Sequence, residues 1–123
     1  MRPDPEILLV EDNADDVAIA KRAFRQSELA ERVAIVRDGS EALDYLFDGG
    51  EHPLPKVILL DLKMPRMDGR EVLRRVRSNE RTRQIPVVIV STSAHPDDIK
   101  SCYRLGANSF VVKPVSSALK RLR

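Results

Sequence analysis

Five short apolar runs, spread along the whole chain, most strongly constrain how this sequence can fold. They occupy residues 7–10, 33–36, 57–60, 87–90 and 110–112. Most are continuous rather than alternating, and they are rich in valine and isoleucine. Continuous β-branched runs of this length are typical of strands buried on both faces, as in a parallel sheet.

Segments with helical spacing of apolar residues separate and follow these runs. In each segment the apolar residues share one helix face: Val17, Ala20, Ala23 and Phe24 in the first, Ala42, Leu43, Leu46 and Phe47 in the second, Val72, Leu73 and Val76 in the third, Ile99, Cys102, Tyr103 and Leu105 in the fourth, and Ala118, Leu119 and Leu122 in the fifth. Ser40 is the expected N-cap of the second helix, and Pro96 and Asp97 the expected start of the fourth. The alternation predicts an α/β fold, a doubly wound open five-stranded parallel sheet with helices on both faces, in one of a few strand orders.

Length and composition limit what the chain can be. Its 123 residues suit a single domain, 1–123, with no output domain. The net charge of +2 argues against a dedicated nucleic-acid binder. No apolar stretch approaches the ~20 residues of a membrane span, the N-terminus lacks signal-peptide character, and the single cysteine suits a reducing compartment. We therefore expect a cytoplasmic protein that binds neither nucleic acid nor membrane. The arginine-rich stretch 66–83 fits a solvated helix face or, less simply, a surface for an acidic partner.

Polar side chains follow all five runs, and only those after the second run, Arg37 and Asp38, look ordinary. Glu11 and Asp12 follow the first run, Asp61 the third, Ser91 the fourth and Lys113 the fifth. Ligands of open α/β sheets bind at the carboxyl ends of the strands, so we expect these side chains to meet there. Each has an ordinary reading as a cap, a helix start or a surface residue, but the joint pattern favours a site.

The expected site has a definite chemistry. Two carboxylates 4 Å apart repel by ~4 kcal/mol at an effective dielectric of 20, and a hard cation relieves this repulsion. Mg²⁺ suits oxygen ligands, with Asp12 and Asp61 as direct ligands and Glu11 acting mostly through water. Asp61, directly after the central strand, is the expected phosphoryl acceptor, and Ser91 and Lys113 are the expected donors to the phosphoryl oxygens.

The chain resembles the receiver domain of two-component response regulators. The resemblance rests on residues 8–12 (LLVED), 59–65 (LLDLKMP) with Asp68-Gly69, 85–91 (IPVVIVS) and 105–114 (LGANSFVVKP), and it covers nearly the whole chain. It implies the flavodoxin-like and CheY-like strand order 2-1-3-4-5. It also implies a phosphorylation-regulated signalling domain rather than an enzyme, one that promotes only its own phosphotransfer and dephosphorylation.

The resemblance also implies individual roles. Asp61 is then the phosphoacceptor, Glu11 and Asp12 form the acidic pocket, and the backbone carbonyl of Lys63 is a further ligand of Mg²⁺. The resemblance implies that Lys63, together with Ser93, tunes the lifetime of the aspartyl phosphate. We expect the Lys63 ammonium to slow self-dephosphorylation.

Three further residues take part in the implied switch. Ser91 supplies the hydroxyl that moves to the phosphoryl group, and Phe110 turns inward as it does so. Lys113 pairs with the phosphoacceptor, and the Lys113–Pro114 bond is expected to be cis.

The partners follow from the same resemblance. The long loop 48–55, the opening 10–16 and the pairing of 91–93 with 105–109 resemble stand-alone receivers that serve phytochrome-type or similar sensor histidine kinases. Only ten residues follow Lys113, so the last helix is expected to be short. We expect a homodimer through the face formed by the fourth and fifth helices and the fifth strand, and an unidentified downstream protein target.

Rival functions remain open. An aspartate-nucleophile phosphatase would usually carry a second acid where Lys63 stands, and a cap domain for which there is no room. A flavin or nucleotide carrier needs a phosphate-binding loop, but residues 11–16 are acidic. A receiver-like interaction module that is never phosphorylated is the third alternative.

Overall fold

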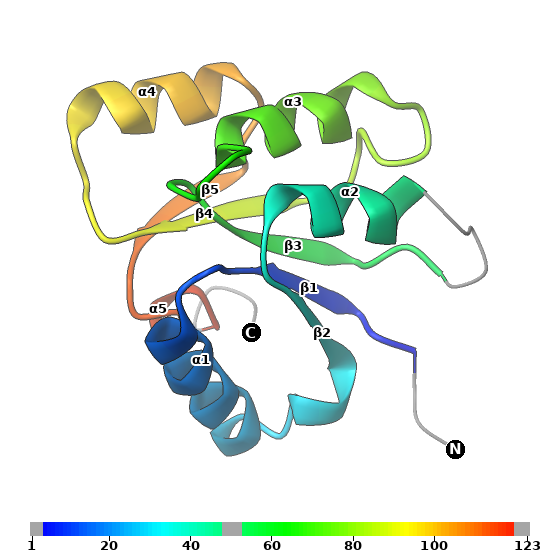
Figure 1. Ribbon diagram of the computed structural model, residues 1–123, viewed down its shortest axis with the longest axis vertical. Helices are drawn as coiled ribbons and strands as arrows, with labels where there is room; N and C mark the ends of the chain where they lie inside the picture. Colours follow the sequence, from blue (N-terminus) through cyan, green and yellow to red (C-terminus); the bar gives the residue numbers. More distant parts are fainter. Residues whose placement is uncertain (1–3, 48–52, 120–123) are drawn as a thin grey trace.

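Five parallel strands form the centre of the structure, in the order β2-β1-β3-β4-β5 (Figure 1). This computed structural model describes residues 4–47 and 53–119. The strands are β1 (Ile7–Val10), β2 (Val33–Val36), β3 (Val57–Asp61), β4 (Val87–Ser91) and β5 (Ser109–Val112). They contain the five apolar runs, so the predicted strands and their doubly wound order are confirmed.

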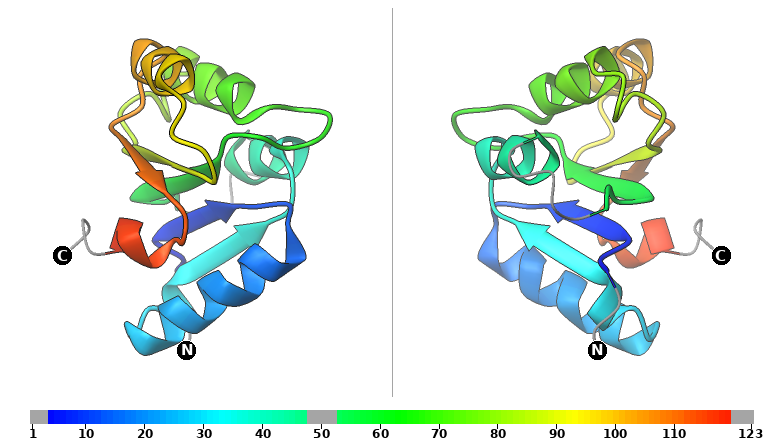
Figure 2. Two further views of the ribbon diagram at one scale, coloured as in Figure 1. Left: turned by 90° about the vertical axis from the view of Figure 1, so that its left-hand side faces the viewer. Right: turned by 90° about the vertical axis from the view of Figure 1, so that its right-hand side faces the viewer.

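Helices cover both faces of the sheet. They are α1 (Ala14–Gln26), α2 (Gly39–Phe47), α3 (Gly69–Ser78), α4 (Pro96–Arg104) and α5 (Ser116–Leu119), with a short 3₁₀ turn η1 (Ala30–Arg32) before β2. Helices α2, α3 and α4 lie on one face, and α1 and α5 lie on the other (Figures 1 and 2). Within the described residues, no helix combines the length and apolar content needed to cross a membrane.

The strand sequences explain this three-layer arrangement. Successive residues of a strand point to opposite faces, so one strand can contribute to two cores. Leu8 and Leu60 pack with α2 and α3, whereas Leu9 and Leu59 pack with α1 and α5. All residues of β1, β3 and β4 are buried, as continuous apolar runs predict. Strand β2 differs: it is an edge strand, and the first three of its four residues are only half-buried.

Two predicted helix starts have different outcomes. The prediction that Ser40 caps the second helix is wrong, because α2 already begins at Gly39 and the Glu41 N–H donates to Asp38 Oδ1 over 2.8 Å. Helix α4 begins at Pro96 as predicted. Leu122 and residues 48–52 of the long loop lie outside the described residues.

Candidate phosphorylation site

Three carboxylates meet at the carboxyl ends of β1 and β3. Because Val10 lies beside Leu60 in the parallel register, the residues that follow them also lie side by side. Glu11, Asp12 and Asp61 each place one oxygen within 4.8 Å of the others. The side chains of Glu11 and Asp61 are buried, at 5% and 8% exposure. The prediction that these three residues converge is confirmed, and hard oxygen donors at this spacing fit a divalent cation such as Mg²⁺.

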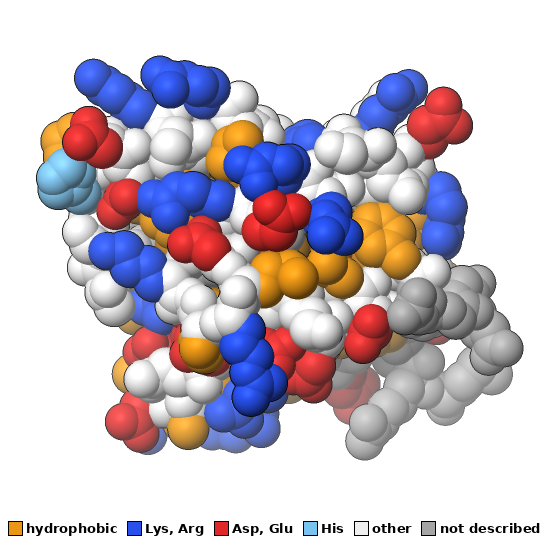
Figure 3. Space-filling model, turned by 45° about the horizontal axis from the view of Figure 1, so that its top comes forward, with side chains coloured by type: hydrophobic (Ala, Val, Ile, Leu, Met, Phe, Trp, Pro, Cys, Tyr) orange, Lys and Arg blue, Asp and Glu red, His pale blue; other side chains and the backbone are white. Residues whose placement is uncertain are grey.

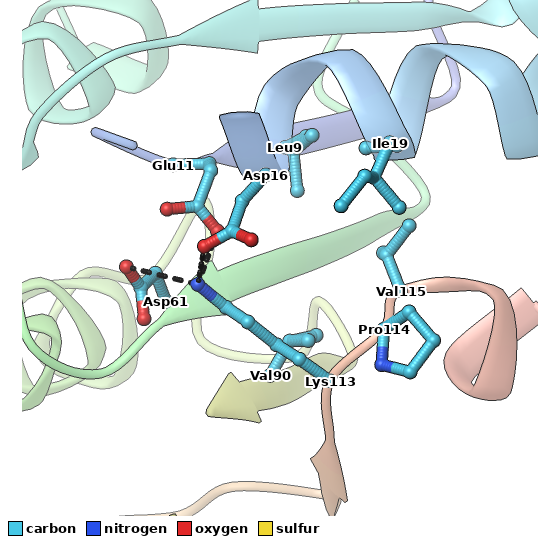
Figure 4. Close-up of a pocket in the computed structure, with 10 residues that line it drawn as sticks. Leu9, Glu11, Asp16, Ile19, Asp61, Val90, Lys113, Pro114 and Val115 are labelled. Carbon is cyan, nitrogen blue, oxygen red and sulfur yellow. Dashed lines mark hydrogen bonds and ion pairs between the residues drawn. The ribbon is translucent and has the colours of Figure 1, made fainter. Parts of the chain in front are cut away.

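Lys113, which follows the edge strand β5, brings a positive charge to this cluster. Its side chain extends past Val90 from the end of β5 (Figure 4). Its Nζ lies 2.7 Å from Glu11 Oε1, 2.7 Å from Asp16 Oδ2 and 3.6 Å from Asp61 Oδ2. One ammonium therefore faces a surplus of carboxylates. The peptide bond from Lys113 to the next residue, Pro114, is cis, as expected.

The protonation tendencies of Asp61 and Lys113 follow from burial and from the charges around them. Burial first, and then the hydrogen bond and charge of Glu11, together raise the pKa of Asp61 to about 8, while the charge of Lys113 opposes them. Burial alone would lower the pKa of Lys113, but hydrogen bonds to Asp16 and Glu11 outweigh it and raise that pKa above its usual value. The ammonium therefore stays charged, whereas Asp61 needs a compensating cation to ionise fully near neutral pH.

Ser91 occupies the neighbouring strand end. It is the last residue of β4, it is buried, and the register pairs Asp61 with Val90, the residue before it. Its Oγ accepts the N–H of Ser93 over 3.2 Å. The Lys113 N–H donates to the Ser91 carbonyl over 2.8 Å, which ties the ends of β4 and β5 together.

Two other predicted residues lie outside the carboxylate cluster. Phe110 is already buried in the core on the α3 and α4 side, at 9% exposure. Lys63 is mostly exposed, and its ammonium lies 3.8 Å from Asp98 Oδ2 on α4. The roles of Phe110, Lys63 and Ser93 stay predictions.

The loop after β3 is held tightly against the site. The Gly69 N–H donates to the Leu62 carbonyl over 2.8 Å, and Asp68 caps α3 by accepting the N–H of Arg70. A Cβ on Gly69 would lie 2.3 Å from the carbonyl oxygen of Asp61, so only glycine fits there. The Asp68-Gly69 pair thus fixes the start of α3 directly beside the strand end that carries Asp61.

Asp16 is a site residue that the sequence reasoning missed. It lies in the first turn of α1 and contacts Lys113, 97 residues away. A cleft of about 260 Å³ opens beside this contact, and its apolar wall includes Leu9, Ile19 and Val115 (Figure 4). The available signal was the position of Asp16, one helical turn before the buried Ala20 on the same face.

Known proteins show the same arrangement over nearly the whole chain. The family described as "Response regulator receiver domain" matches residues 7–122. The probable methanogenesis regulatory protein FilR2 of Methanothrix harundinacea is 45% identical over 112 residues, which are 89% of this chain and 72% of that protein. The response regulator Rcp1 of Synechocystis is 39% identical over 114 residues, 90% of this chain and 78% of that protein.

A solved structure agrees with both relatives. The bacteriophytochrome response regulator RtBRR superposes with a TM-score of 0.82 at 42% identity, covering 99% of this chain and 77% of that one. The family model, the related sequences and the solved structure all cover most of this chain. The chain therefore belongs to the family of response regulator receiver domains.

Proposed function

We propose that this receiver takes a phosphoryl group onto Asp61 from the phosphohistidine of a sensor histidine kinase. The observation that carries the proposal is the placement of a buried Asp61 between two further carboxylates and the ammonium of Lys113. A buried carboxylate with an ammonium beside it has both a nucleophilic oxygen and a partner for the incoming negative charge.

The transfer can be written from the residues of this chain. An Asp61 carboxylate oxygen attacks phosphorus, the phosphorus–nitrogen bond of the donor breaks, and the histidine nitrogen keeps the bonding electrons. Lys113 neutralises charge on the phosphoryl oxygens, and the Ser91 hydroxyl donates a hydrogen bond to one of them. Mg²⁺, held by Glu11, Asp12, Asp61 and the Lys63 carbonyl, would supply further charge neutralisation when bound.

The signal then leaves through protein contacts. The movement of Ser91 toward the phosphoryl group repositions Phe110 and shifts the surface formed by α4, β5 and α5. This surface carries exposed Tyr103 and Val112, and it is the proposed homodimer face.

The proposed kinase is of the phytochrome type. The support is the likeness to RtBRR, a bacteriophytochrome response regulator. We place the protein in the cytoplasm, in keeping with its single free thiol, Cys102.

Labelling with a small phosphodonor tests the proposal. With acetyl phosphate and Mg²⁺, the wild type should gain one acid-stable, base-labile phosphoryl group, and Asp61→Asn should gain none. Asp15→Asn is the matched control, because it removes an exposed carboxylate outside the site. Labelling of Asp61→Asn at the wild-type rate would contradict the assignment. No labelling of the wild type would favour an unphosphorylated interaction module, and multiple turnover of a phosphate ester would favour a phosphatase.

A further inference from the structure

Asp16 contacts the site but has no part in the proposed phosphotransfer. Its Oδ2 lies 2.7 Å from the Nζ of Lys113, and its side chain is 28% exposed. It is not one of the three carboxylates whose spacing suits a shared cation. Asp16 and Asp61 approach the ammonium from different directions (Figure 4). The contact of Asp16 with the site is therefore through Lys113.

The Lys113 ammonium does not contact its three carboxylate neighbours equally. Two oxygens, from Glu11 and Asp16, lie at 2.7 Å, within the range of strong charge-assisted hydrogen bonds. The nearest Asp61 oxygen lies at 3.6 Å, which is too long for a good hydrogen bond. In the unphosphorylated structure the Lys113 ammonium therefore lies closer to Asp16 than to Asp61, the proposed phosphoacceptor.

A phosphoryl group on Asp61 adds oxygens that need the same donors. The ammonium must then give up part of an existing contact. Glu11 belongs to the cation cluster, where a bound cation competes for its carboxylate. Asp16 lies outside that cluster, so a bound cation would not compete for its carboxylate. The contact with Asp16 is therefore the one that opposes the transfer of the ammonium to the phosphoryl group.

We propose that Asp16 is a positioning residue that restrains Lys113 in the unphosphorylated state and competes with the phosphoryl group for its ammonium. The inference rests on the proposed function, because it needs a phosphoryl group on Asp61. Asp16 then sets how favourable the phosphorylated state is, without touching the phosphoryl group itself.

Binding of beryllium trifluoride, a stable mimic of the phosphoryl group, tests the inference. In the presence of Mg²⁺, Asp16→Asn should bind the mimic about threefold to tenfold more tightly than the wild type, because the ammonium is released from an ionic partner. Asp15→Asn, the matched control in the same helix turn, should change the affinity less than twofold. Asp16→Ser, which removes the charge in a smaller side chain, should reproduce the gain if Asp16→Asn folds poorly.

A second background separates the contact with Lys113 from a general loss of negative charge. In Lys113→Ala protein, Asp16→Asn should change the affinity less than twofold. The same gain in that background, or no gain with Lys113 present, would overturn the inference. Failure of the wild type to bind the mimic at all would instead overturn the proposed function, so the two failures are distinguishable.

Discussion

At the scale of single residues, burial determines the chemistry of Asp61. Burial is the largest of the causes that raise its pKa to about 8, ahead of the neighbouring Glu11. The carboxyl therefore binds a proton or shares a cation at neutral pH. Burial thus distinguishes Asp61, the proposed phosphoacceptor, from the exposed acidic residues of the chain.

The same pKa predicts how stability depends on pH without a divalent cation. The folded-state pKa lies above the unfolded value of about 3.9, so the stability that Asp61 contributes is present below pH ~4 and is lost as pH rises through about 8. Asp61→Asn cannot ionise. With divalent cations removed by a chelator, the free energy of unfolding of Asp61→Asn should exceed that of the wild type by about 2–4 kcal/mol at pH 8. This difference should shrink toward pH 4. Urea denaturation at several pH values, repeated with saturating Mg²⁺ to recover the wild type, measures this. A difference that does not vary with pH would contradict it.

Lys63 carries a prediction about the lifetime of the phosphorylated state. We expect its ammonium to shield the aspartyl phosphate from water, so Lys63→Ala should shorten the half-life severalfold. In the structure Asp98 holds this ammonium at 3.8 Å, so Asp98→Asn should free it and lengthen the half-life. Timed loss of labelled phosphate measures both variants, and an unchanged half-life in Lys63→Ala would contradict the role.

At the scale of elements, charged side chains bind α3 and α4 to their surroundings. Figure 3 shows basic side chains gathered over these helices, with acidic side chains among them. Arg70 pairs with Asp98 and donates to Ser101 Oγ over 3.0 Å, which joins the start of α3 to α4. Arg74 and Arg75 pair with Glu71, so part of the arginine-rich stretch is an ion-paired helix surface.

Arg77 should matter far more to stability than its neighbour Arg75. Its guanidinium donates to the carbonyls of Ile85 at 2.8 Å and Gly106 at 2.9 Å, and to Asn108 Oδ1 at 2.7 Å. It therefore ties the end of α3 to the turn between α4 and β5. Arg77→Ala should lower the free energy of unfolding by about 2–4 kcal/mol, because it leaves several acceptors unpaired.

Arg75→Ala is the matched control for Arg77→Ala. Among the described residues, the ion pair of Arg75 is a mostly exposed one with Glu71, at 3.0 Å, so its removal should cost less than about 1 kcal/mol. Denaturant unfolding of both variants measures the comparison. Equal decreases in the free energy of unfolding of the two variants would contradict the prediction that the hydrogen bonds of Arg77 stabilise the fold.

At the scale of the whole molecule, two large apolar side chains stand exposed on one surface. Tyr103 on α4 and Val112 on β5 are 47% and 44% exposed. Strand β5 is an edge strand of the sheet, and α5 follows it in the chain. Exposed apolar groups at the end of a sheet mark a surface suited to association.

Dimer formation through this surface can be tested with one charge. With Mg²⁺ and beryllium trifluoride, the wild type should dimerise, and Val112→Arg should weaken the dimer more than tenfold, because it buries an unpaired charge. Ser40→Arg is the control, because Ser40 is exposed on α2, which lies between β2 and β3 in the chain and outside the proposed face. Light scattering over a concentration series measures both. A wild type that stays monomeric would contradict the proposed dimer.

Sequence alone determined the strands, the helix faces and the meeting of Glu11, Asp12, Asp61 and Lys113. The physical reason is simple: continuous apolar runs must be buried on both faces, and parallel strands end at the same edge. Residues that follow such runs on neighbouring strands therefore lie close enough for their side chains to meet. Resemblance to a family was needed for the strand order, which the alternation of elements alone left open.

Only the tertiary structure decided which partners the side chains take. The sequence does not show that Lys113 contacts Asp16, or that Lys63 contacts Asp98. Nor does it show that the first three residues of β2 are only half-buried. These contacts depend on how the end of β5 packs against the start of α1, and the β3 loop against α4. Such packing joins segments far apart in the chain, where local pattern and spacing carry no information.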